Sequence, residues 1–118
     1  MPVRSLRSSV LRWPDRATVE AAVRAWAAAT AAEKAEVCRV GFFGSYARGD
    51  WGVGSDVDLI VVVERAGLPF ERRAIEFDTT PLPVPADLFV YTLEEWDRSS
   101  GSGSQRAVAD EVVWVLRR

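Results

Sequence analysis

The sequence of 118 residues has no histidine, one cysteine and one lysine, and these shortages exclude several kinds of active site. Without histidine there is no Ser-His-Asp triad, no HExxH zinc site and no cysteine nucleophile paired with histidine. Cys38 alone forms neither an intrachain disulfide nor a CxxC site, and we interpret it as a small buried hydrophobe in an apolar strand. Lys34 lies between Glu33 and Ala35, which excludes a Walker A phosphate-binding loop.

Long apolar runs and an excess of positive charge are also missing. The longest strongly apolar run is Leu59 to Val63, whereas a signal peptide needs about 7–15 apolar residues and a membrane helix about 18 or more. We therefore expect a cytoplasmic protein with no membrane partner. Basic residues number 15 and acidic residues 17, a net charge of −2. The chain as a whole has no electrostatic attraction to nucleic acid, and no direct nucleic-acid binding is expected.

The composition that remains is that of one globular domain. Apolar residues make up 48% of the chain and charged residues 27%, enough to bury a core at this length. Three arginines and no acid occur in the first twelve residues, so we separate a basic and flexible N-terminal segment, residues 1–14, from a domain over residues 15–118. No internal repeat is visible.

The sequence predicts a helix from Asp15 to about Glu36, because large or β-branched residues recur there at spacings of four, three and four. They are Val19, Val23, Trp26 and Thr30. Pro14 followed by Asp15 is a suitable helix start, since the aspartate can accept from the first free amides.

Further along, β-branched and aromatic segments predict four strands. They span residues 37–43, 57–64, 87–91 and 112–116. Helices are predicted at 70–77, after Thr92 where Glu95 completes a capping box, and at 105–110, which follows a flexible Gly-Ser break at 101–104. This order predicts an α+β or α/β fold, a small mixed β-sheet flanked by helices.

Isolated side chains allow simpler interpretations. Arg72 and Arg73 are read as a solvated helix face, and Trp51 as a residue that either covers a core edge or stacks on a base. The remaining tryptophans are interpreted as core or interface residues. They are Trp13, Trp26, Trp96 and Trp114.

The segment that follows the first predicted strand begins with Gly44 and Ser45. Glycine at that point lets the backbone approach a ligand, while exposed amides and the serine hydroxyl can face a phosphate. A helix starting directly afterwards would add a partial positive charge at the same place.

Three acids stand at the starts of apolar strands. Asp56 and Asp58 are two residues apart, so strand alternation turns both carboxylates to one face, where they repel unless a cation lies between them. Asp87 opens the next apolar strand, and pairing of these strands would bring it beside the other two. Converging carboxylates favour Mg²⁺, and two such ions would stabilise an in-line displacement at phosphorus. The sequence therefore predicts phosphoryl or nucleotidyl transfer.

The arrangement Gly-Ser, ten residues, Asp-x-Asp, with a strand before and after, resembles the nucleotidyltransferase superfamily typified by DNA polymerase β. More narrowly, Gly-Ser-Tyr-Ala-Arg-Gly with Ser-Asp-Val-Asp-Leu resembles the minimal nucleotidyltransferases, the antitoxin (MNT) half of HEPN/MNT toxin–antitoxin pairs. The resemblance covers roughly residues 15–118 and implies the polymerase β-like fold.

The resemblance also implies roles for six residues. Asp56, Asp58 and Asp87 would form the catalytic, metal-binding set, with two Mg²⁺ ions. Gly44 and Ser45 would hold the triphosphate of an NTP, ATP in the first instance, and Arg48 would help neutralise phosphate. A salt bridge supporting the loop is the alternative role for Arg48.

The resemblance implies transfer of AMP to a tyrosine of a helical HEPN toxin. Larger relatives carry an additional acceptor-binding region, and we expect this chain to receive its acceptor from another protein. Two alternatives are a non-catalytic antitoxin that blocks its toxin by binding alone and a nucleotidyltransferase acting on a small molecule. A homodimer or a hetero-oligomer is compatible with each of them.

Overall fold

A computed structural model describes residues 14–52, 54–99, 101 and 103–118. The predicted basic segment therefore lies outside the described residues except for Pro14, and Trp13 lies outside them as well. The described elements follow in chain order: α2 (Arg16–Glu33), β1 (Val37–Phe43), α3 (Ser45–Arg48), β2 (Val57–Val63), the 3-10 helix η1 (Phe70–Glu76), β3 (Ala86–Thr92), α4 (Leu93–Ser99), α5 (Gly103–Glu111) and β4 (Val113–Arg117).

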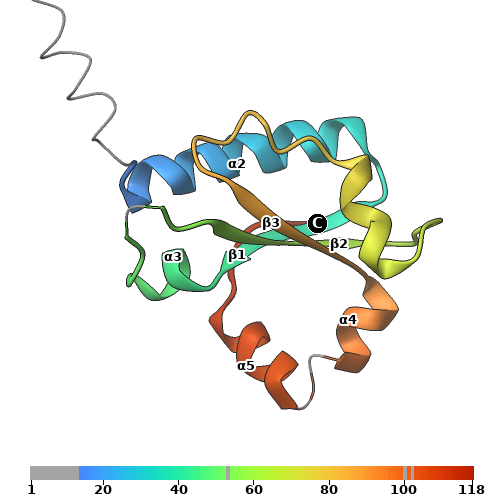
Figure 1. Ribbon diagram of the computed structural model, residues 1–118. Coiled ribbons are helices and arrows are strands. Elements are labelled where there is room, and N and C mark those ends of the chain that lie inside the picture. Colours follow the sequence, from blue (N-terminus) through green and yellow to red (C-terminus); the bar gives the residue numbers. More distant parts are fainter. Residues whose placement is uncertain (1–13, 53, 100, 102) are drawn as a thin grey trace, which may run out of the picture.

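The strands form one mixed sheet in the order β3-β2-β1-β4 (Figure 1). β1 is antiparallel to both β2 and β4, whereas β2 and β3 are parallel. This arrangement confirms the predicted α+β class with a small mixed sheet. The predicted strands match the observed ones to within one residue at each end.

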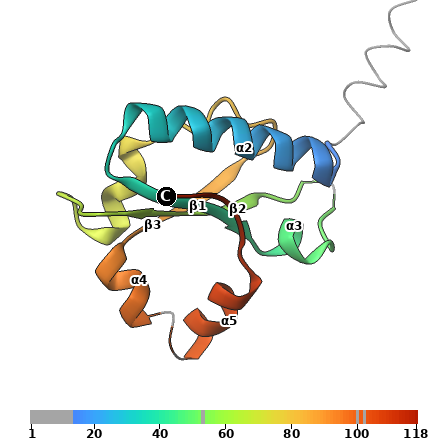
Figure 2. The ribbon, with the colours of Figure 1, turned by 180° about the vertical axis from the view of Figure 1, so that it is seen from behind.

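Helices cover both faces of the sheet. α2 lies along one face, and α4 and α5 lie against the other (Figures 1 and 2). Alternation along β2 divides the core accordingly, because Leu59 and Val61 pack into the cluster beneath α2 while Ile60 and Val62 pack with Trp96 of α4. β2 is thus buried on both sides from Leu59 to Val63, which suits the continuous apolar sequence of that part of the strand.

α2 begins and is oriented as the sequence predicted. The Asp15 side chain accepts from the Thr18 amide at 2.8 Å, and the predicted stripe of four residues is buried. Trp26 also donates from its indole to the Asp78 carbonyl at 2.7 Å, which ties α2 to the segment after η1. No helix in the described parts of the chain is long and apolar enough to cross a membrane.

Two helices differ from the predictions, one in its type and one in its starting residue. The predicted 70–77 helix is a 3-10 helix, and α5 begins at Gly103, inside the predicted break at 101–104. Gly103 has φ +64°, a conformation that glycine adopts without strain, and the later turns of α5 place Val108 and Ala109 against the Ile60 cluster. Packing on the sheet therefore extends the helix beyond its local sequence preference.

Arg73 is buried, so its interpretation as a solvated residue was wrong. It is 7% exposed, and its guanidinium donates to the carbonyls of Leu68 and Val90. It also forms a two-pronged ion pair with the Glu95 carboxylate. Glu95 in turn accepts from the Thr92 amide at 2.9 Å, while its own amide donates to the Thr92 hydroxyl, the capping box predicted at the start of α4. One charged network thus joins η1, β3 and α4.

We expect Glu95→Gln to lower the free energy of unfolding at neutral pH by about 1–3 kcal/mol, because the Arg73 guanidinium would lose its ionic partner. The Arg73 guanidinium and the Thr92 amide lower the pKa of Glu95 from 4.5 to about 2. The folded chain therefore binds this proton less tightly than the unfolded chain. The stabilisation is complete above pH 4.5 and is lost as the pH falls through about 2.

Urea denaturation of the two proteins across this pH range measures the difference. Glu94→Gln is the matched control, since the Glu94 side chain is 84% exposed and its nearest cationic partner lies at 3.8 Å. A Glu95→Gln loss that is independent of pH would contradict the ionic role.

Candidate active site

The six residues singled out in the sequence lie at one end of the sheet. β1 ends at this end, and β2 and β3 begin there. Because β4 is antiparallel to β1 and pairs Val113 with Phe42, the junction of α5 and β4 reaches the same end. The end of β1 and the starts of β2, β3 and β4 therefore lie at the same end of the sheet.

Gly44, directly after β1, packs on the carboxylate of Asp58. A Cβ placed on Gly44 would lie 2.2 Å from Asp58 Oδ2, and the backbone has φ +78° and ψ −149°, a region that L side chains avoid. Glycine is therefore required both by the backbone conformation and by the neighbouring acid. Through this contact, the Gly44-Ser45 turn packs directly against β2.

Asp58 and Asp87 are direct neighbours across the parallel strands β2 and β3, where their Cα atoms are paired. Asp56 precedes β2 by one residue and lies on the same edge. Burial, followed by the charges of Asp87 and Asp56, raises the pKa of Asp58. The acids therefore repel one another, as the sequence predicted for carboxylates without a cation between them.

The three acids differ in exposure. Asp58 is half-buried, while Asp56 and Asp87 are exposed. Across the described ranges, no three Asp, Glu or Cys side chains lie close enough together to hold a metal ion, so the expected convergence of all three acids is not seen. The donor set nevertheless suits a hard divalent cation, because a half-buried carboxylate with a raised pKa lies beside a second carboxylate and gains from an opposite charge.

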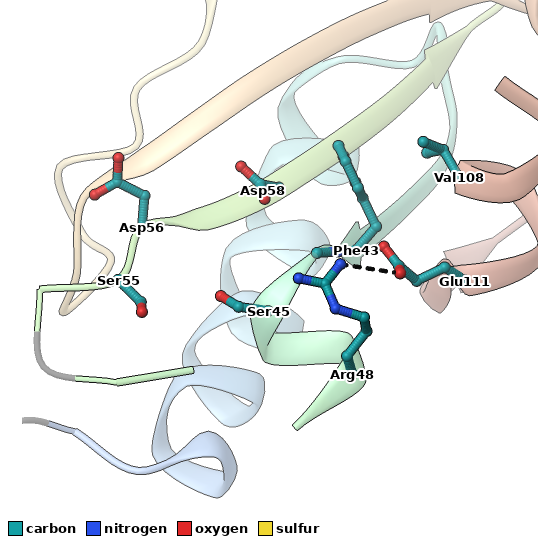
Figure 3. Close-up of a pocket in the computed structure, with 9 residues that line it drawn as sticks. Phe43, Ser45, Arg48, Ser55, Asp56, Asp58, Val108 and Glu111 are labelled. Atoms are coloured by element: carbon teal, nitrogen blue, oxygen red, sulfur yellow. Dashed lines mark hydrogen bonds and ion pairs between the residues drawn. The ribbon is translucent and has the colours of Figure 1, made fainter. Parts of the chain in front are cut away.

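A pocket of about 450 Å³ opens beside these residues (Figure 3). Its lining includes five of the six predicted residues, Asp87 being the exception: Gly44, Ser45, Arg48, Asp56 and Asp58. Ser45 begins α3, and in Figure 3 its side chain lies below Asp58 and beside the guanidinium of Arg48. The volume is within the range of small-molecule binding sites.

Arg48 pairs with two carboxylates, as its structural interpretation proposed. Its Nε donates to Asp50 at 3.1 Å and its Nη1 to Glu111 at 3.1 Å. These two acids raise the pKa of Arg48, so it stays charged at the mouth of the pocket. The side chain is 51% exposed, which leaves part of its fork accessible from solvent.

Glu111 lines the pocket and was not among the predicted residues. Its second carboxylate oxygen accepts from the Gly44 amide at 2.7 Å. The sequence held a signal for it, since Glu111 comes just before an apolar strand, as Asp56 does before β2. The sequence did not show that β4 pairs with β1, and this pairing places Glu111 at the end of the sheet where the other site residues lie.

The side chains of Trp51 and Ser55 both make contacts within the protein. The Trp51 ring stacks on the buried Tyr46 ring, with centroids 5.5 Å apart and planes at 8°, so Trp51 covers a core edge. The Ser55 hydroxyl accepts from the Gly52 amide at 2.9 Å and closes the turn before β2.

We expect Gly44→Ala to destabilise the protein more than Gly49→Ala does. Gly49 also has a positive φ, +88°, but nothing lies within 4 Å of a Cβ placed there. The strain at Gly49 alone should cost about 1–2 kcal/mol. At Gly44 the contact with Asp58 adds to the strain, so shortening Asp58 to alanine should recover part of the Gly44→Ala loss. Urea denaturation of the wild type, Gly44→Ala, Asp58→Ala and the double variant tests the contact. If the losses in the free energy of unfolding of the two single variants simply add up in the double variant, the contact is contradicted.

We also expect Asp58→Asn to raise the free energy of unfolding in a metal-free buffer. Because the pKa of Asp58 is raised above 3.8 in the folded chain, the folded form binds this proton more tightly than the unfolded form. Wild-type stability should then fall, relative to the variant, as the pH rises above 3.8 and through the raised pKa, and the two proteins should converge below pH 3.8. Asp97→Asn, an exposed acid on α4, is the control; an Asp58→Asn protein less stable at neutral pH would oppose the repulsion argument.

Comparison with known proteins agrees with this geometry. A presumed nucleotidyltransferase from Sulfolobus solfataricus, whose crystal structure is known, has the same fold: the TM-score is 0.65 at 21% identity, over 87% of this chain and 84% of that one. No match was found among curated protein sequences. The family model of the nucleotidyltransferase domain matches residues 27–114, three quarters of the chain, and includes all six predicted residues. The chain therefore belongs to the nucleotidyltransferase domain family.

Proposed function

We propose that this protein transfers AMP from ATP, with Mg²⁺, to a hydroxyl of another protein, and that the acceptor is a tyrosine of a HEPN toxin that the chain neutralises as an antitoxin. The observation that carries the transfer reaction is the pairing of Asp58 with Asp87 next to the Gly44-Ser45 turn. The turn and both acids lie within residues 27–114, the part of the chain that matches the nucleotidyltransferase domain family.

Two cation positions are proposed between the carboxylates and the triphosphate. Asp58 would contribute to both because it is central, with Asp56 before it on the chain and Asp87 beside it on β3. When bound, the cations supply positive charge to the phosphate oxygens and make the acceptor hydroxyl more acidic.

The chain's own residues would bind and orient the nucleotide. The Ser45 hydroxyl borders the pocket, and no hydrogen bond to it occurs among the described residues, so it can donate to a phosphate oxygen. Arg48 would neutralise phosphate charge with the part of its fork that faces solvent. The acceptor oxygen then bonds to the α-phosphorus, pyrophosphate leaves, and Asp87 takes the hydroxyl proton.

The proposal of a protein acceptor rests on the family resemblance and on the site's size and exposure. A pocket of about 450 Å³ accommodates a small molecule, and Asp87 lies outside its lining on an exposed edge of the sheet. A tyrosine presented by a partner could reach this edge from solvent. The encounter would take place in the cytoplasm.

The test is incubation of the protein with labelled ATP and Mg²⁺, with and without the product of the neighbouring gene, which the proposal expects to be a HEPN protein. We expect label on the partner, located by mass spectrometry to a tyrosine, and loss of the label when that tyrosine is changed to phenylalanine. Binding and neutralisation without label would instead support the non-catalytic antitoxin. Label on small molecules from an extract, with none on the partner, would support the small-molecule enzyme.

We expect Asp87→Asn and Ser45→Ala to separate chemistry from binding. Asp87→Asn is nearly isosteric but cannot accept the proton, so turnover should collapse while ATP still binds through Asp56 and Asp58. Ser45→Ala removes one donor to a charged oxygen and should raise the ATP dissociation constant by the equivalent of about 1.5–3 kcal/mol, with a smaller effect on turnover at saturation.

Calorimetry and single-turnover assays measure the two effects. Asp97→Asn on α4 serves as the charge-matched control for Asp87→Asn. Near-normal transfer by Asp87→Asn would remove its proposed role, and ATP binding that is equally tight in EDTA and in Mg²⁺ would remove the cation positions.

A further inference from the structure

The side chain of Glu111 lines the pocket and binds two separate parts of the segment that follows β1. Its Oε2 accepts from the Gly44 amide at 2.7 Å, and its Oε1 accepts from Arg48 Nη1 at 3.1 Å. Both are charge-assisted hydrogen bonds, and the second is visible as the dashed line in Figure 3. The Glu111 side chain is only 24% exposed, so solvent competes weakly for it.

The fold brings Glu111 to this position through the antiparallel pairing of β1 and β4. Glu111 ends α5, two residues before Val113, which pairs with Phe42. Gly41 makes the close approach possible, because a Cβ there would lie 2.5 Å from Val112 Cγ1 and 2.9 Å from the Val113 carbonyl oxygen. The junction of α5 and β4 therefore lies tightly on the end of β1, with its acid over the turn.

The bonds made by Glu111 hold a backbone that would otherwise be free to relax. Gly44 occupies a region of φ and ψ that costs free energy for most residues and leaves glycine many alternatives in the absence of restraint. The Gly44 carbonyl accepts from the Arg48 amide at 2.9 Å, and its amide is held by Glu111. With both of these groups bonded, the peptide that leads into Ser45 has a defined orientation.

We propose that Glu111 is a positioning residue that orders the phosphate-binding turn, fixing Gly44, and through it Ser45, together with Arg48 before the nucleotide arrives. This role rests on the proposed function, in which Ser45 and Arg48 contact the triphosphate. In this role Glu111 would contact neither the nucleotide nor a metal. It acts through the Gly44 amide and the Arg48 guanidinium, which it binds. The nucleotide then binds a turn that is already ordered, so less conformational entropy is lost on binding.

The opposing possibility is that Glu111 competes with phosphate, because its carboxylate also lies where an anion could bind. The two ideas predict opposite effects of Glu111→Gln, which keeps the shape of the side chain and one acceptor but removes the charge. Ordering predicts weaker nucleotide binding, whereas competition predicts tighter binding. Asp110→Asn removes the same charge one residue earlier, from an exposed side chain, and is the matched control.

The first measurement needs no nucleotide. In NMR spectra of the full-length protein, we expect the Gly44 amide to lose its downfield shift and its protection from hydrogen exchange in Glu111→Gln. The Gly49 amide, which donates to the Ser45 carbonyl at 2.9 Å, should be much less affected. Asp110→Asn should leave both amides as in the wild type. A Gly44 amide that is unchanged in Glu111→Gln would overturn the proposal.

The second measurement is calorimetry with ATP and Mg²⁺. We expect the dissociation constant to rise about ten-fold in Glu111→Gln and to stay within about two-fold of wild type in Asp110→Asn. Equal or tighter binding by Glu111→Gln overturns the ordering role and leaves the proposed function standing. A wild-type protein that binds no ATP in Mg²⁺ overturns the proposed function, and with it this role of Glu111.

Discussion

The parallel pairing of β2 with β3 is the constraint on which the site depends. This pairing places Asp58 opposite Asp87. The rest of the paired register, from Leu59↔Leu88 to Val63↔Thr92, holds the two acids in place. β2 is buried on both faces from Leu59 to Val63, with Leu59 and Val61 packed in one core cluster and Ile60 and Val62 in the other. A slip by one residue would exchange these two sets and disrupt the packing on both faces. The core thus keeps the two carboxylates as neighbours, and burial, followed by the charges of Asp87 and Asp56, raises the pKa of Asp58.

Stability and site geometry are linked through small residues at the end of β1. Gly44 allows the turn to rest on Asp58, and Gly41 allows the start of β4 to rest on β1. A side chain at either place would separate elements that the pocket requires together. The two glycines therefore matter mainly because they let neighbouring elements approach closely, and less because they are flexible. Glycine inside or beside a strand lowers stability, so the close approach at the site costs some stability of the fold.

Much of this arrangement could be predicted from the sequence, because the signals were local. The stripe of α2, the apolar β2, the capping box of Thr92 with Glu95, and the shared edge of Asp56 and Asp58 follow from spacings of two to four residues. Arg73 could not be predicted as buried, because its ion pair with Glu95 joins positions 22 residues apart and pairs two charges that each look solvated alone. Glu111 escaped for the same reason, since its bond to Gly44 joins positions 67 residues apart. The start of α5 at Gly103 was also missed, because packing against the sheet outweighs the preference of a Gly-Ser segment.

The charges around the pocket explain why its two sides have to be built by different elements. Among the described lining residues, three carboxylates face one guanidinium, and Asp87 adds a further carboxylate at the edge. A triphosphate entering this field would be repelled, so the acids suit a nucleotide only together with cations. The donors that we propose for phosphate come from the turn after β1, whereas the acids that we propose for the cations lie at the starts of β2 and β3, so the two sets belong to different elements. The two sides meet where Gly44 packs against the carboxylate of Asp58, so the position of the turn relative to the acids depends on that contact.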